Sequence, residues 1–292
     1  MRITNGMLAR EAAAGFQRQM QALDAARREA STGTKVSRPS DDPVAAAGIM
    51  QSDSGLRALD QYRKNLESGQ ARLNVEDSVL DQLSNALIRA KELAISQADD
   101  TASAETRKTS QAEVDRLIDF VKDLADTQLA GRYLFGGQYA DSAPYGGGAL
   151  DPAKPPSGSF PIEVGAGQFV ETNHSAQEIF VDSDVVDSLT ALSTALGADD
   201  TTAVQSALTR LDAAFDAVQE KIGDLGARMN QLDIGMSNIE SLGVNLQTFR
   251  SKLSDADLSA AVTELVSRQN TLQAAMLANS RILDLTLTDY LR

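Results

Sequence analysis

A leucine recurs at every seventh position in the first half of the chain. The row consists of Leu59, Leu66, Leu73, Leu80 and Leu87, and Ala94 continues it. A seven-residue repeat places these side chains along one narrow stripe of an α-helix, which becomes buried only against another helix. The pattern therefore predicts a helix from about Gly55 to Gln97 that pairs with a second helix.

A matching series lies near the C-terminus, where apolar residues alternate at spacings of three and four. It consists of Leu208, Leu211, Phe215, Val218, Ile222, Leu225, Met229, Leu232, Met236 and Ile239. The spacing changes between Leu253 and Leu258, and a new series begins at Leu258. We therefore expect two helical segments joined at residues 254–257.

The N-terminal region predicts a second joint, at residues 34–42. An amphipathic stretch from Ala9 to Ala30 stops at Gly33, and glycine suits the left-handed residue that ends a helix. Pro39 holds Arg38 in an extended conformation. Asp42 followed by Pro43 is typical of a helix start, because aspartate caps the free N–H groups and proline has none to satisfy.

The middle of the chain has a different composition. A stripe ending in Val121, Leu124 and Gly131 predicts a helix that Ser103 or Thr101 could cap. Beyond it, five of the seven prolines fall between Pro144 and Pro161. Short strands are predicted at Phe160–Val164, Gln168–Glu171 and Glu178–Val181.

The length of the first heptad helix indicates the fold class. A helix of about 43 residues is roughly 65 Å long at 1.5 Å per residue. A compact globule of this chain length is only about 50 Å across. We therefore expect an elongated, mainly α-helical coiled-coil rod with paired N- and C-terminal helices and a small β-rich insertion.

Composition excludes several kinds of function. The formal net charge is −14 and the isoelectric point is near 4.5, which argues against nucleic acid and anionic membrane surfaces as partners. The absence of cysteine excludes disulfides and thiolate metal sites. Neither a cleaved secretory signal nor a transmembrane segment is visible.

The sequence offers few candidates for catalysis or metal binding. The pairs Asp41-Asp42, Asp99-Asp100 and Asp199-Asp200 each precede a predicted helix, where capping explains them. His174, the one histidine, lies between predicted strands without evident partners. We therefore expect no catalytic residue, no metal site and no cofactor.

Both ends of the chain carry apolar stripes that need a partner. A large apolar side chain left in water forfeits about 1.5–3 kcal/mol, so we expect the ends to pair with each other, with neighbouring subunits, or with both. This indicates a subunit of a polymer. The candidate polymer-interface residues are Met7, Phe16, Met20, Leu23, Leu258, Val262, Leu265, Leu272, Met276, Leu283, Leu287 and Tyr290. The candidate joint residues are Arg38, Pro39, Asp41, Asp42, Pro43, Asp255 and Asp257.

Three segments resemble the bacterial flagellar hook-associated protein 3 family, the flagellin-like hook–filament junction proteins. They are the stretch from Ser31 to Ala47 with Arg38-Pro39-Ser40-Asp41-Asp42-Pro43 at its centre, the stretch Gly131–Gly137, and the closing stretch Ile282–Leu291. Flagellin shares the terminal helices, but its joint usually lacks this form. The resemblance covers nearly the whole chain.

The resemblance implies a non-enzymatic subunit of the flagellum. It implies export by the flagellar type III apparatus without signal cleavage, help from a dedicated chaperone, and an extracellular ring of copies between the first hook-associated junction protein and flagellin. The corresponding domains are 1–42 plus 254–292 as an inner tube, 43–133 plus 195–253 as a helical rod, and 134–194 as an outer β-rich insertion. The alternatives are a flagellin-type filament subunit, a secreted coiled-coil translocator and an appendage-borne hydrolase.

Overall fold

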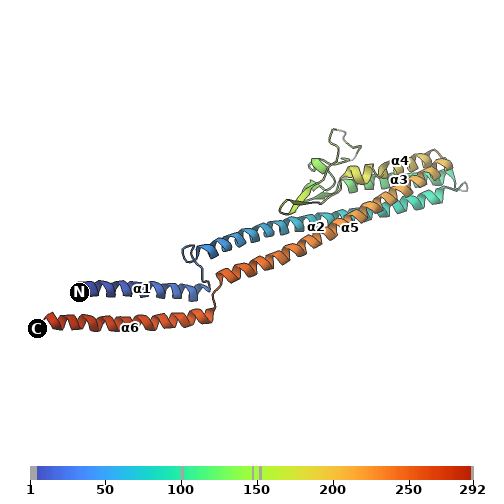
Figure 1. The fold of residues 1–292 in the computed structure, drawn as a ribbon. Helices are drawn as coiled ribbons and strands as arrows, with labels where there is room; N and C mark the ends of the chain where they lie inside the picture. The colour runs from blue at the N-terminus through green and yellow to red at the C-terminus, as the bar shows by residue number, and fades with distance from the viewer. Residues whose placement is uncertain (1–4, 100–101, 147, 151–152, 291–292) are drawn as a thin grey trace. The chain divides into compact units, whose positions relative to one another are not determined.

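The computed structural model describes residues 5–99, 102–146, 148–150 and 153–290 (Figure 1). The α-helices are α1 (Asn5–Thr32), α2 (Pro43–Gln97), α3 (Ala104–Ala125), α4 (Val185–Gly197), α5 (Thr201–Ser254) and α6 (Leu258–Tyr290). The strands are β1 (Gln128–Leu129), β2 (Arg132–Tyr133), β3 (Pro161–Gly165) and β4 (Gln168–Glu171). A short 3₁₀-helix, η1 (Gly137–Tyr139), and a π-helix, η2 (Gln177–Val181), complete the order.

The chain divides into two compact units. The first comprises Met1–Ala58 and Ser241–Arg292, and the second comprises Leu59–Glu240. Helices α2 and α5 each contribute residues to both units. Among the described helices, none is both long enough and apolar enough to cross a membrane.

The heptad prediction is confirmed in the second unit. Leu66, Leu73, Leu80 and Leu87 of α2 are at most 1% exposed. They share one core with every seventh residue of the α5 series: Leu211, Val218, Leu225, Leu232 and Ile239. Helices α2 and α5 run antiparallel, because Gln70 bonds to Asp233 while Lys91, further along α2, pairs with Asp212.

Helices α3 and α4 pack together beside this pair (Figure 1). Ser103 caps α3, as expected, by accepting a hydrogen bond from the Thr106 N–H. The helix ends at Ala125 and not near Gly131, because Ala130 and Gly131 have positive φ and form the turn of the β1–β2 hairpin. Helix α4 begins at Val185, where the sequence pattern did not indicate a helix.

Two of the three predicted strands are confirmed. They form the antiparallel β3–β4 hairpin, which pairs Ile162 with Val170. The strand predicted at Glu178–Val181 is wrong, since this segment belongs to the π-helix η2. Ile179 and Phe180 are adjacent and both fully buried, and Phe180 meets Phe135 edge to face at 5.6 Å. A strand would direct these two neighbours to opposite faces.

The first unit has a much thinner core. Helix α1 packs against α6, and Arg250 of α5 forms an ion pair with Asp53 of α2 at 2.6 Å. Among its described residues, the buried apolar side chains are Ala26, Ala45, Ala46, Ala261 and Leu272. Four of these five are alanine, so this unit buries little apolar surface by itself.

Candidate assembly surface and joint

The two predicted joints exist and are bonded to each other within the first unit. The segment between α1 and α2 pairs with the segment between α5 and α6 through an antiparallel bridge of Thr34 with Asp255. The Lys35 N–H donates to the Ser254 carbonyl and the Ala256 N–H donates to the Gly33 carbonyl, both at 2.8 Å. The two linking segments are therefore held together by backbone hydrogen bonds.

Gly33 makes this geometry possible at the end of α1. Its φ is +67°, the left-handed conformation predicted for it, and its N–H donates to the Glu29 carbonyl at 2.9 Å. A Cβ at this position would lie 3.9 Å from Leu258, so the constraint on residue 33 is conformational and not steric.

The joint carboxylates are bonded to backbone N–H groups. Asp42 Oδ1 accepts from Val44 and Ala45 at the start of α2, where Pro43 is the first helical residue. Asp257 Oδ1 likewise accepts from the N–H groups of residues 259 and 260 at the start of α6. Each cap of this kind contributes about 1 kcal/mol.

The remaining joint residues are all exposed. Asp41 Oδ2 accepts from the N–H groups of Ser37 and Arg38, which closes a turn before α2. Asp255 accepts a hydrogen bond from the Ser251 hydroxyl. Pro39 is exposed in the same turn.

Lys35 is a joint residue that the sequence did not indicate. Its ammonium group donates to the Lys252 carbonyl at 2.7 Å, near the C-terminus of α5. A cation there satisfies a free carbonyl and complements the negative end of the helix dipole. The sequence signal was a basic residue two positions after a helix-ending glycine, but its target lies 217 positions away.

The three aspartate pairs do not all cap helices. Asp200 caps α5 through the Ala203 N–H, as Asp42 caps α2. Asp199 instead accepts from the buried guanidinium of Arg107. Helix α3 is capped by Ser103 and not by the preceding pair, of which Asp100 lies outside the described residues, as does Thr101.

The predicted interface residues differ in their exposure. Phe16, Leu23 and Leu265 are half-buried, and Leu272 is buried at 9% exposure. The others with described side chains are exposed: Met7 at 60%, Met20 at 41%, Leu258 at 56%, Val262 at 49% and Met276 at 47%. Leu283, Leu287 and Tyr290 lie outside the residues whose side chains are described.

Further exposed apolar side chains lie in the first unit. The residues that the sequence did not indicate as interface candidates are Val44, Met50, Leu242, Val244, Phe249, Val266 and Leu277. Exposed large apolar side chains are candidates for protein–protein contact where several of them lie on the same helices. We name the exposed members of the two groups on α1 and α6 the terminal-helix surface: Met7, Met20, Leu258, Val262, Val266, Met276 and Leu277.

The described residues contain no group of three His, Asp or Glu side chains suited to a metal ion. His174 does have close partners, contrary to the sequence-based interpretation. They are Glu76 and Asp224, which are 98 and 50 positions away in the chain. No local pattern could have identified them.

Family models match both ends of the chain. The bacterial flagellin N-terminal helical region matches residues 3–140, and the bacterial flagellin C-terminal helical region matches residues 208–291. Together the two regions cover more than half of the chain.

Individual proteins agree with this match. A flagellin of Halalkalibacterium halodurans is 26% identical, over 84% of this chain and 82% of its own length. The flagellar hook-associated protein 3 of Escherichia coli is also 26% identical, over 84% of this chain and 85% of its own. A solved structure of a putative flagellar hook-associated protein from Vibrio parahaemolyticus has the same fold, with a TM-score of 0.67 at 20% identity, covering 74% of this chain and all of that one.

The resemblance to hook-associated protein 3 noted in the sequence is thereby confirmed. Flagellins and hook-associated proteins are structural, non-enzymatic components of the flagellum. The chain belongs to the flagellin family and is a structural subunit of the bacterial flagellum.

Proposed function

We propose that this chain joins the flagellar hook to the filament. It would form a ring of copies between the first hook-associated junction protein and flagellin. The observation that carries the proposal is the poor core of the first unit, which buries mostly alanine while large apolar side chains on α1 and α6 stay exposed. Neighbouring subunits would bury this terminal-helix surface.

The energetics favour assembly through this surface. Full burial of one Val, Leu or Met side chain is worth about 1.5–3 kcal/mol, and these side chains are about half exposed. Several such gains per subunit would help to offset the entropy that is lost when subunits associate and their side chains become ordered. We therefore propose residues 1–42 plus 254–292 as the inner tube, 43–133 plus 195–253 as a surrounding helical layer and 134–194 as the outer insertion.

The hydrogen-bonded joint suits a subunit between two different structures. It bonds the segment after α1 to the segment before α6, which supports the pairing of these two terminal helices next to the joint. Export through the flagellar type III apparatus without cleavage, assisted by a chaperone, completes the proposal and follows from the resemblance. The intact mass of protein shed into the medium tests the absence of cleavage.

A filament subunit is the second candidate, because a flagellin matches this chain as well as a hook-associated protein does. One label separates the two. The chain has no cysteine, so Ala166→Cys, in the exposed turn between β3 and β4, gives a single thiol-reactive site. Dye on live cells at one point between hook and filament supports the junction, whereas dye along the filament supports flagellin.

The terminal-helix surface is tested by Val262→Asp. A carboxylate buried in an apolar interface without a partner costs several kcal/mol. Because each 1.4 kcal/mol lowers an affinity about tenfold, the affinity of the variant for neighbouring subunits should fall by orders of magnitude. The control is Thr263→Asp, which places the same charge at an exposed polar position one residue away. We expect normal secretion of both variants, loss of filaments for the first only, and flagellin in the medium. Filament attachment by Val262→Asp would contradict the assignment.

A further inference from the structure

Four consecutive polar residues are buried in the second unit, where apolar residues would be expected. They are Thr172, Asn173, His174 and Ser175, each 1% exposed, between β4 and η2. Burying polar groups is costly unless every one is hydrogen-bonded. We name residues 172–175 the buried plug.

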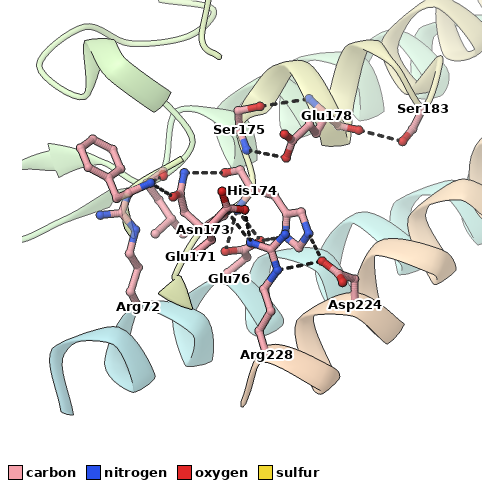
Figure 2. Close-up of polar contacts among 12 residues, drawn as sticks. Arg72, Glu76, Glu171, Asn173, His174, Ser175, Glu178, Ser183, Asp224 and Arg228 are labelled. Atoms are coloured by element: carbon pink, nitrogen blue, oxygen red, sulfur yellow. Dashed lines mark hydrogen bonds and ion pairs between the residues drawn. The ribbon is translucent and has the colours of Figure 1, made fainter. Parts of the chain in front are cut away.

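The plug is held by bonds at each of its residues. Asn173 accepts from the Phe160 N–H at 2.6 Å, and Thr172 donates its hydroxyl to the Phe160 carbonyl. The Ser175 N–H donates to Glu178 of η2. The Asn173 carbonyl accepts from Arg228 of α5 at 3.0 Å. These contacts tie the β3–β4 hairpin to the helices through the plug (Figure 2).

His174 lies at the centre of this arrangement, between two carboxylates from different helices (Figure 2). Its Nδ1 is 2.5 Å from Glu76 Oε1 of α2, and its Nε2 is 2.9 Å from Asp224 Oδ2 of α5. With both carboxylates ionised, each can only accept hydrogen bonds, and the two contacts then require a proton on each ring nitrogen. The geometry is that of an imidazolium ion bridging two helices.

Glu76 is the group that favours a positive charge on this ring. Its side chain is 0% exposed, and it also accepts from the His174 backbone N–H at 3.2 Å. Without a cation beside it, a buried carboxylate is strongly unfavourable. On the same helix, Arg72 interacts with Glu76 by charge, but its guanidinium is bonded to the Leu134 carbonyl.

The other charged groups around the ring do not replace the imidazolium. On α5, Arg228 bonds to Asp224 at 2.8 Å and lies 3.8 Å from Glu171 of β4. Glu178 of η2 adds a further carboxylate at the end of the plug. The groups named here are four carboxylates and the guanidiniums of Arg72 and Arg228, with Arg132 beside Arg72 over the Phe160 ring. A positive ring brings this set closer to charge balance.

These interactions shift the pKa values of His174 and Asp224 so that both groups favour their charged forms. Burial opposes the charged ring, but the hydrogen bond and charge of Glu76 outweigh it and raise the pKa of His174 above its usual value. Burial also opposes ionisation of Asp224, yet the bonds from His174 and Arg228 lower the pKa of that carboxyl. Since the folded pKa of His174 is raised, its stabilisation is complete below about pH 6.5 and is lost as pH rises through the folded pKa.

We propose that the buried plug acts as a proton-dependent switch, in which protonated His174 holds the β3–β4 hairpin on α2 and α5, and the loss of its proton as pH rises releases the hairpin. On deprotonation one ring nitrogen loses its hydrogen and faces a carboxylate oxygen as acceptor against acceptor. Glu76 then remains buried with no cation hydrogen-bonded to it among the described residues. The plug therefore loosens with the hairpin that it anchors, while the apolar α2–α5 core remains in place.

One histidine in the whole chain allows a direct test. In the full-length protein, freed of any histidine tag, the ¹H–¹³Cε1 signal of the imidazole belongs to His174 alone. We expect its titration midpoint above pH 6.5 in the wild type and at lower pH in Glu76→Gln and Asp224→Asn. The matched control is Asp233→Asn, an exposed α5 carboxylate bonded to Gln70, which should leave the midpoint unchanged.

Urea unfolding supplies a second readout. The wild type should lose more of its free energy of unfolding between pH 5.5 and pH 9 than His174→Gln does, because the variant has no ring to titrate. A wild-type midpoint at or below pH 6.5 would overturn the proposal even if a variant failed to fold. So would midpoints equal in the wild type and both carboxylate variants.

Discussion

Replacing Gly69 by alanine should destabilise the protein, although the same substitution in a helix usually stabilises it. Gly69 is buried on α2, at the place where the β3–β4 hairpin and α5 meet that helix. A Cβ there would lie 2.7 Å from Ile162 Cδ1, 2.9 Å from Thr172 Cγ2 and 3.3 Å from Leu232 Cδ1. Alanine at this site must therefore displace atoms of the hairpin and of the buried plug.

The two contacts below 3.0 Å differ in their ability to move. Ile162 Cδ1 is the end of a flexible side chain and can rotate away. Thr172 is 1% exposed, and both its N–H and its hydroxyl donate to the Phe160 carbonyl, so it cannot. Overpacking of this kind costs about 1–3 kcal/mol. Alanine for glycine in a helix interior gains about 0.5–1 kcal/mol. Gly69→Ala should lower the free energy of unfolding by about 1 kcal/mol.

Gly223→Ala is the matched control. Gly223 is exposed on α5 in the same unit, and a Cβ there would meet nothing within 4 Å. This variant should gain about 0.5–1 kcal/mol, since only the helix term remains. Urea unfolding followed by far-UV circular dichroism, with equal m-values, measures both changes. If Gly69→Ala proves as stable as Gly223→Ala, the packing of the hairpin on α2 described above is incorrect.

Three further predictions concern single side chains. Asp42→Ala should cost about 1 kcal/mol by leaving N–H groups at the start of α2 unbonded, seen as faster amide exchange at Val44 and Ala45. Arg107→Ala should lower the free energy of unfolding in urea by about 2 kcal/mol, because this buried guanidinium bonds to two carbonyls and to Asp199. If Asp199→Asn lowers it by the same amount, the two carbonyl bonds contribute nothing. Burial raises the pKa of Tyr145 to about 12, so stability should fall as pH rises above about 10, and Tyr145→Phe should remove the latest step of the tyrosine absorbance titration.

The heptad spacing was sufficient to predict the paired helices. Residues seven apart on α2 and on α5 are buried together, because an apolar stripe has one favourable environment wherever the chain places it. The joints were predictable for a similar reason. Gly33, Asp42 and Pro43 act on neighbouring backbone groups, so their roles are encoded within a few residues.

Segments without a strong period were less predictable. Glu178–Val181 has the composition of a strand, but Ile179 and Phe180 both enter the same core, which a helical turn allows and a strand does not. Helix α4 likewise follows a left-handed Asp184, whose φ is +55°, and its packing against α3 is a long-range contact.

What the sequence determined by itself is the set of interactions that a residue makes with its own helix or turn: apolar stripes, helix caps and helix ends. The tertiary structure alone decided which distant groups meet. It brought Lys35 to the end of α5, and it enclosed His174 between Glu76 and Asp224. The physical reason is that hydrogen bonds and charge pairs act over a few ångströms, whereas these partners are separated by many residues along the chain.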